Sequence, residues 1–173
     1  LRDQKPENIN LEFKLQKALI ANGINTPLFL ELRGAPILIE SGTDFITLTK
    51  YIESDSIRHK DLKRSREFLK EIGLTLAKVQ SALKDFPYKS VPPNYLHPEY
   101  QQKYNFSKEE TPTSEAIKNV IDRLYILFED LKLPKTLIHG DLNDGNYLTQ
   151  GNKITAVLDL ETSEHNFRIL DIS

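Results

Sequence analysis

The sequence contains no cysteine, so neither a disulfide framework nor thiolate chemistry is available to it. It also lacks any apolar run near the roughly 20 residues that a membrane-spanning helix needs. Its net charge of -2 provides no broad positive field for nucleic acid or anionic membrane. These absences lead us to expect a cytoplasmic protein that binds neither nucleic acid nor membrane.

Methionine is absent as well, and the chain begins at Leu1. We therefore expect the chain to be incomplete, either because its ends are missing or because modified methionines were left out of the sequence. The 173 residues suffice for one ordinary domain or two small lobes. With 39% hydrophobic and 28% charged residues, the composition is typical of a globular protein.

The N-terminal third predicts one helix and a small antiparallel sheet. Apolar residues recur at helical spacing between Asn10, which can cap a helix, and Gly23, which can end one. Short apolar runs follow, separated by the turn residues Arg33-Gly34 and by residues 41–44. This punctuation predicts three antiparallel strands.

The middle of the sequence predicts two long helices, at 58–85 and 113–131, because apolar positions repeat there at helical intervals. A Pro- and Tyr-rich connection separates them, since consecutive prolines cannot continue a helix. The apolar stripe expected to face the core in the second helix is Ile117, Val120, Leu124, Leu127 and Leu131. Short strands are expected in the last third, at 136–140, 146–150 and 153–161.

The basic stretch RHKDLKRSREFLK, residues 58–70, raises the alternative of a nucleic-acid-binding helix. Its charges fall between the apolar positions, which is the pattern of a solvated helix face. Because the whole chain is slightly acidic, we favour the solvated face. A nucleic-acid interface would instead bind with a steep dependence on salt.

The stretch LIHGDLNDGN, residues 137–146, gathers polar side chains behind a short apolar run. A polar turn is the structural alternative, because Asn, Asp and Gly are the residues that turns prefer. Asp141 and Asn146 share this stretch, and Asp159 ends the next apolar run, ITAVLD. Carboxylate and amide oxygens suit Mg²⁺ rather than zinc or copper. Phosphoryl transfer needs such a metal and a separate carboxylate that orients the attacking hydroxyl.

The order of these residues is similar to the protein-kinase catalytic loop H-R-D-L-x-x-x-N, with Gly after His139 in place of Arg. HGDLNDGN followed by LDLE resembles the aminoglycoside phosphotransferase and choline kinase family, which includes homoserine kinase-like members. The resemblance implies an α+β, protein-kinase-like, two-lobed fold. Residues 1–52 would be the remainder of the nucleotide-binding lobe, and residues 53–173 the mainly helical lobe with the catalytic loop and metal-site hairpin. A protein kinase is disfavoured, because no D-F-G or A-P-E segment is present.

The resemblance also implies an ATP-dependent small-molecule kinase with Mg²⁺ as cofactor. Asp141 would be the catalytic base or orienting group, and Asn146 and Asp159 would be the metal ligands. The carboxylates around the site favour a small acceptor with a positively charged amine, such as an amino alcohol, an amino sugar or homoserine.

Further residues of the resemblance are expected to support the site. His139 would orient the loop through hydrogen bonds, and Asp171 in RILDIS would be a buttress of the loop. Glu161 is either a second neighbour of the metal or a polar residue at a strand end. GLTLAKVQSAL resembles the family helix that usually reads G-x-x-L-A-x-L-H, with Gln80 where His is common.

The nucleotide is expected to meet two parts of the chain. TLTKYIES, residues 47–54, resembles the linker between the lobes, where the Lys50 carbonyl and the Ile52 N–H would face the adenine edge. Glu12 fits the helix Glu that pairs with a phosphate-contacting base, and Arg2 is a candidate for that base. The seven glycines are isolated and form no Gly-rich phosphate loop, so an inactive kinase-like binding module is the alternative.

Overall fold

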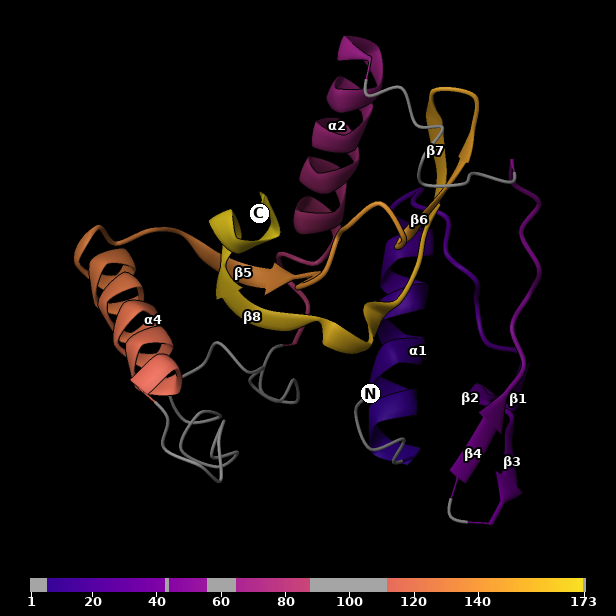
Figure 1. Cartoon of the computed structure of the whole chain (residues 1–173). Coiled ribbons are helices and arrows are strands. Elements are labelled where there is room, and N and C mark those ends of the chain that lie inside the picture. The colour runs from indigo at the N-terminus through magenta and orange to yellow at the C-terminus, as the bar shows by residue number, and fades with distance from the viewer. Residues whose placement is uncertain (1–5, 43, 56–64, 88–111, 173) are drawn as a thin grey trace.

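The computed structural model describes residues 6–42, 44–55, 65–87 and 112–172 (Figure 1). Within these ranges, the structure contains helices, antiparallel strand pairs and two short 3₁₀ segments, which confirms the α+β class. The helices are α1 (Pro6–Ala21), α2 (Arg66–Ala82) and α4 (Pro112–Asp130), and the 3₁₀ segments are η2 (Leu160–Thr162) and η3 (Arg168–Ile172). The strands are β1 (Glu31–Leu32), β2 (Ala35–Pro36), β3 (Leu38–Ser41), β4 (Asp44–Thr47), β5 (Lys135–Ile138), β6 (Tyr147–Gln150), β7 (Lys153–Val157) and β8 (Glu164–Phe167).

Helix α1 begins earlier than the sequence predicted and ends where it predicted. Asn10 lies inside the helix rather than at its cap, because Pro6 already opens the first turn, where a missing N–H costs nothing. Gly23 follows the helix with a φ of 75°. The N–H groups of Gly23 and Ile24 each donate to a carbonyl of the last turn at 3.0 Å, which is the usual Gly-based helix end.

The N-terminal strands number four in the described residues rather than the three predicted. Arg33 and Gly34, with φ values of 53° and 84°, close a two-residue turn between β1 and β2, and this makes a separate hairpin. β3 pairs with β4 in a second hairpin. An isolated bridge between Phe29 and Thr49 joins the segments that flank the two hairpins.

Helix α2 starts at Arg66, where the Ser65 hydroxyl accepts a hydrogen bond from the Phe68 N–H at 3.1 Å and so caps the first turn. The predicted beginning of this helix, residues 58–64, and the Pro- and Tyr-rich connection at 88–111 lie outside the described residues. No helix of the described ranges is both long enough and apolar enough to cross a bilayer.

The apolar stripe predicted to face inward on α4 is exposed, so this prediction is wrong for the residues whose side chains are described. Val120, Leu124, Leu127 and Leu131 retain 45–59% of their accessible surface. The physical reason is that no described element covers this face. α4 meets β8 through Phe128, whose ring packs edge-on against Phe167 with the two ring centroids 5.4 Å apart.

One hydrophobic core joins α1 and α2 to the C-terminal strands. Each buried Leu or Val in it contributes roughly 1.5–3 kcal/mol. In Figure 1, α1 lies between the N-terminal hairpins and the β5–β8 pair. Through this core α1 packs against β5, β7 and η2, which lie on either side of residues 139–146 in the sequence. The buried members are Leu11, Leu15, Leu19, Ile24, Val79, Leu83, Leu137, Val157 and Leu160.

Two strand pairs in the last third position the candidate residues. β5 pairs with β8, which the sequence did not predict, and β6 pairs with β7. β7 ends at Val157, earlier than predicted, so Asp159 follows the strand instead of ending it. Asp159 has left-handed backbone angles, φ 56° and ψ 68°, and begins the turn into η2.

Candidate functional site

The polar loop 139–146 connects β5 to β6, and Leu158 ties it to the segment after β7. The buried His139 ring donates from Nε2 to the Leu158 carbonyl at 2.7 Å and accepts at Nδ1 from the Asp141 N–H at 3.3 Å. The Leu158 N–H donates to the Asn146 carbonyl at 2.8 Å. Both ends of the loop are thus fixed to the residue that precedes Asp159.

The loop also holds itself together with its own side chains. The exposed Asp141 carboxylate accepts from Asn143 Nδ2 at 2.8 Å and from Asn146 Nδ2 at 3.0 Å. Asn146 Nδ2 also donates to the Asp141 carbonyl at 2.7 Å. Because the amide nitrogen of Asn146 is committed to Asp141, its Oδ1 is the atom left for a cation.

The donor chemistry at this place fits Mg²⁺. Asn146 Oδ1 and the carboxylate of the exposed Asp159 are hard oxygen donors. The Asp159 side chain makes no capping hydrogen bond to η2. No set of three His, Cys, Asp or Glu side chains in the described ranges could hold a metal by itself. Two protein oxygens, completed by phosphates and water, are the usual way in which Mg²⁺ is held beside a nucleotide.

Asp171 lies under the start of the loop. It is 7% exposed, and its two oxygens accept the backbone N–H groups of His139 at 3.1 Å and Gly140 at 2.8 Å. Gly140 has a φ of 83°, and a Cβ built there would lie 2.5 Å from the Thr162 carbonyl oxygen. The chain therefore passes η2 too closely for any residue other than glycine. Glu161, in η2, is half-buried, and its role stays a prediction.

Burial lowers the pKa of His139 below its ordinary value. The hydrogen bond to Leu158 and the charges of Asp171, Asp159 and Asp141 oppose this shift without cancelling it. The ring is therefore neutral at pH 7, which agrees with its use of one nitrogen as donor and the other as acceptor. A neutral, buried ring keeps its Nε2 proton for the hydrogen bond to Leu158 and bears no positive charge at neutral pH.

A neutral His139 predicts loss of stability in mild acid. The unfolded chain binds a proton on this residue near pH 6.5, whereas the folded chain resists it until a lower pH. The free energy of unfolding should therefore fall as the pH drops below 6.5, by up to about 1.4 kcal/mol per pH unit for this one group. Urea unfolding at pH 7.5 and 5.5 measures the change.

His165 provides the matched control, because burial and then Lys135 lower its pKa in the same direction. His139→Gln should remove more of the acid-dependent loss than His165→Gln, since His165 is much less buried. An acid-dependent loss that survives intact in His139→Gln would contradict the assignment.

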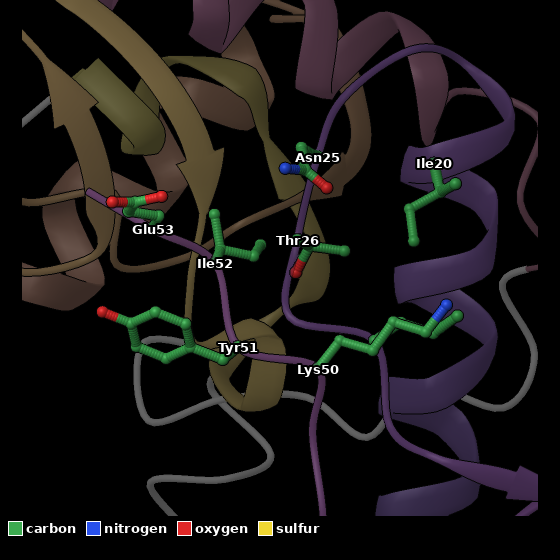
Figure 2. A pocket seen from close by; sticks show the side chains of 8 residues that line it. Ile20, Asn25, Thr26, Lys50, Tyr51, Ile52 and Glu53 are labelled. Carbon is green, nitrogen blue, oxygen red and sulfur yellow. The ribbon is translucent and has the colours of Figure 1, made fainter.

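The linker residues Lys50 and Ile52 border a cavity of about 490 Å³, together with Ile20, Thr26 and Tyr51 among others. Figure 2 shows the Lys50 side chain extending toward α1 and the Tyr51 side chain extending the opposite way. The Lys50 N–H donates to the Leu28 carbonyl at 2.9 Å. Within the described part of the chain, the Lys50 carbonyl and the Ile52 N–H have no hydrogen-bond partner.

Asp55 joins the end of this linker to the hairpin that separates the two candidate metal ligands. Its carboxylate accepts the Gly151 N–H at 2.5 Å, and its own N–H donates to the Thr149 carbonyl at 2.9 Å. Asn146 directly precedes β6 and Asp159 follows β7. The linker and the candidate metal residues therefore belong to one connected unit.

Of the two remaining predicted nucleotide residues, only Glu12 lies in the described part of the chain. Glu12 is half-buried on α1, where its carboxylate accepts from Gln16 Nε2 at 3.3 Å. Arg2 lies outside the described residues, so its pairing with Glu12 stays a prediction. Sequence reasoning missed Asn143, Asp55 and Arg168, whose Nε donates to the Gln80 side-chain oxygen at 2.9 Å. The Asn-x-Gly turn was a local signal for Asn143, whereas the contacts of the other two join distant segments.

The model of the phosphotransferase enzyme family matches residues 1–173, while none of the curated proteins matches the chain. The structure is similar to amicoumacin kinase hAmiN in complex with AMP-PNP, Ca²⁺ and Ami, with 13% identity and a TM-score of 0.75 over 98% of this chain and 52% of that one. An aminoglycoside phosphotransferase from Alicyclobacillus acidocaldarius has 15% identity and a TM-score of 0.64 over 98% and 57%. The streptomycin-ATP complex of APH(2″)-IIa has 14% identity and a TM-score of 0.56 over 95% and 58%.

This chain thus spans between 52% and 58% of the length of these three proteins. The likeness shows a kinase-like fold shared with them and confirms the resemblance carried by HGDLNDGN and LDLE. The division of the chain at residue 52 stays a prediction. Since the family model spans every residue of the sequence, the chain belongs to the phosphotransferase enzyme family.

Proposed function

We propose that the full-length protein transfers the γ-phosphate of ATP to a hydroxyl of a small molecule. The observation that carries this proposal is the joint placement of Asp141, Asn146 and Asp159 around one loop and Leu158. The names of the similar structures support it, since they describe kinases in complex with AMP-PNP, or with ATP and streptomycin.

Asp141 is the residue that receives the acceptor hydroxyl in this proposal. Asn143 and Asn146 each donate to one of its oxygens, which fixes the plane of the carboxylate while leaving it exposed. A carboxylate held in this way can orient a hydroxyl and accept its proton. When bound, Mg²⁺ would neutralise the charge of the phosphates, and Asn146 Oδ1 and Asp159 would hold it.

The linker reads the adenine edge in this proposal. Its Lys50 carbonyl and Ile52 N–H form the acceptor and donor pair that a purine edge can satisfy, and both are unused within the described chain. Glu12, paired with Arg2 or another base, would act on the phosphates. The exposed carboxylates of Asp141 and Asp159 favour an acceptor with a positively charged amine, so that the substrate is an amine-bearing metabolite or antibiotic.

The test is an acceptor screen on the full-length protein with Mg²⁺, in which ADP or GDP release is measured with ATP or GTP. The panel contains amino sugars, amino alcohols, homoserine and matched compounds without an amine. Acceptor-dependent release is the expected result. Tight nucleotide binding without release for any acceptor would contradict the proposal and favour an inactive binding module.

Asp159 and Asn146 are expected to differ in how strongly they hold Mg²⁺. Asp159→Asn keeps the shape and removes a charge, so nucleotide binding that depends on Mg²⁺ and turnover should both fall, by roughly 10- to 100-fold. Asn146→Ala removes a neutral oxygen and should raise the Mg²⁺ requirement, with partial recovery at high metal. Mg²⁺ titrations of nucleotide binding measure both changes.

The matched controls are Asp85→Asn and Asn152→Ala, which change exposed residues of the same types away from the loop. Both should keep the wild-type Mg²⁺ dependence. An unchanged Mg²⁺ dependence in Asp159→Asn would exclude this carboxylate as a metal ligand.

A further inference from the structure

Gln80 on α2 is a buried amide whose hydrogen bonds all go to one region of the chain. It is 5% exposed. Its Nε2 donates to the Arg168 carbonyl at 2.9 Å and to Asp171 Oδ2 at 3.2 Å. Its Oε1 accepts from Arg168 Nε at 2.9 Å. The side chain therefore spans the space between a guanidinium and a carboxylate.

Asp171 connects Gln80 to the loop that carries Asp141. The oxygen that accepts from Gln80, Oδ2, also accepts the His139 N–H, while Oδ1 accepts the Gly140 N–H. The position of the Asp171 carboxylate thus fixes two consecutive peptide groups directly before Asp141. Gln80 in turn fixes the rotation of that carboxylate, because it binds one of its two oxygens.

An amide is the group that suits this position. Its N–H₂ end faces the Asp171 carboxylate, and its oxygen faces the Arg168 donor. Leucine would leave Arg168 Nε without this acceptor and would remove one donor from Asp171. Glutamate would place a second negative charge beside Asp171, which disfavours both carboxylates being ionised.

We propose that Gln80 is a positioning residue for phosphoryl transfer, which holds Asp171 so that the backbone of His139 and Gly140 places Asp141. This inference rests on the proposed function. Gln80 touches none of the reacting groups, so its effect should appear in kcat much more than in the KM for nucleotide. We expect Gln80→Leu to lower kcat roughly 10- to 100-fold, since small misplacements of a catalytic group cost this much.

The first measurement is amide hydrogen exchange in the full-length protein, which does not depend on any activity. Gln80→Leu should speed exchange at the His139 and Gly140 amides by roughly fivefold to tenfold, the worth of one hydrogen bond. Gln16→Leu is the matched control. Gln16 is also a buried Gln, 3% exposed, but its side-chain oxygen accepts the Phe29 N–H at 2.9 Å. It should speed exchange at Phe29 and leave the loop amides unchanged.

The second measurement is the pH profile of kcat for Gln80→Glu, which keeps the length of the side chain. The ionisable groups around this position are Asp171, Arg168 and, beyond Asp171, His139. One shared proton would let the new carboxyl donate to Asp171 and restore the contact. The kcat of this variant, relative to wild type at each pH, should therefore rise as the pH falls, whereas Gln80→Leu should show no such recovery.

Different results would contradict the contact between Gln80 and the loop and the role of that contact in the reaction. Unchanged exchange at His139 and Gly140 in folded Gln80→Leu would overturn the contact between Gln80 and the loop. Faster exchange with an unchanged kcat would overturn its role in the reaction. A wild-type protein without any transfer activity would instead remove the proposed function, while the exchange result would still decide whether Gln80 positions the loop.

Discussion

Replacing Asp141 with Asn should lower turnover by about 10²- to 10⁴-fold and leave the binding of Mg-ATP nearly unchanged. The carboxylate is exposed, and its oxygens accept from Asn143 and Asn146. In the proposed function this carboxylate meets the acceptor hydroxyl, and the metal is held by other residues. If phosphoryl transfer is loose, deprotonation comes late and orientation of the hydroxyl accounts for most of the loss.

The substitution also has a structural cost that must be measured separately. An amide at position 141 can accept from only one of the two Asn donors, so one hydrogen bond of the loop is lost. This should lower the free energy of unfolding by about 1 kcal/mol. Calorimetric nucleotide binding, steady-state turnover and urea unfolding on the same preparation separate the chemical loss from the structural one.

Asp144 offers a matched control in the same loop. Its Oδ1 accepts from the Tyr147 hydroxyl at 2.7 Å, and the amide oxygen of Asp144→Asn can still accept that bond. This variant removes the same charge from the same loop and should keep turnover within a few-fold of wild type. Turnover of Asp141→Asn close to that of Asp144→Asn would remove Asp141 from the mechanism.

The loop could be predicted from sequence because its residues satisfy one another locally. Asn146 binds Asp141, and Asn143 accepts the Gly145 N–H at 2.7 Å, all within a few positions of the chain. Spacing of this kind is visible in the sequence itself. The end of α1 at Gly23 could be predicted for the same reason, because the left-handed backbone that ends the helix is a local feature that Gly favours.

Other parts could not be predicted, because their cause lies elsewhere in the chain. Strand β8 carries polar residues that are buried: Glu164 accepts from Asn166 Nδ2 at 2.8 Å, so the usual alternation of apolar and polar residues is absent. The hydrogen bond between Gln80 and Asp171 joins one segment that precedes the loop at 139–146 in the sequence to one that follows it. The exposed apolar stripe on α4 failed for another reason: periodicity predicts a helix but does not show which element covers its apolar face.

The close approach of Gly140 to η2 predicts a large loss of stability for Gly140→Ala. The φ of 83° strains any residue with a side chain, and the new Cβ would lie 2.5 Å from the Thr162 carbonyl oxygen. Hydrogen bonds restrain both Gly140 and η2. The Gly140 N–H is held by Asp171, and the His139 carbonyl accepts the Thr162 hydroxyl at 3.0 Å. Strain and overpacking together should cost roughly 2–5 kcal/mol.

Gly34→Ala separates the two terms. Gly34 has nearly the same φ, 84°, but nothing lies within 4 Å of the place that a Cβ would take, so only the backbone strain remains, about 1–2 kcal/mol. Urea unfolding measures the free energy of unfolding of both variants, provided that its slope against urea concentration stays the same. The difference between the two losses of free energy is the cost of the contact with Thr162.

Equal losses in the two variants would show that the loop can move away from η2. In that case the positions of His139 and Asp141 are not fixed by this contact, and Gly140→Ala should retain its turnover. A larger loss at Gly140, with turnover reduced in the fraction that remains folded, is the result expected if the narrow passage sets the geometry of the loop.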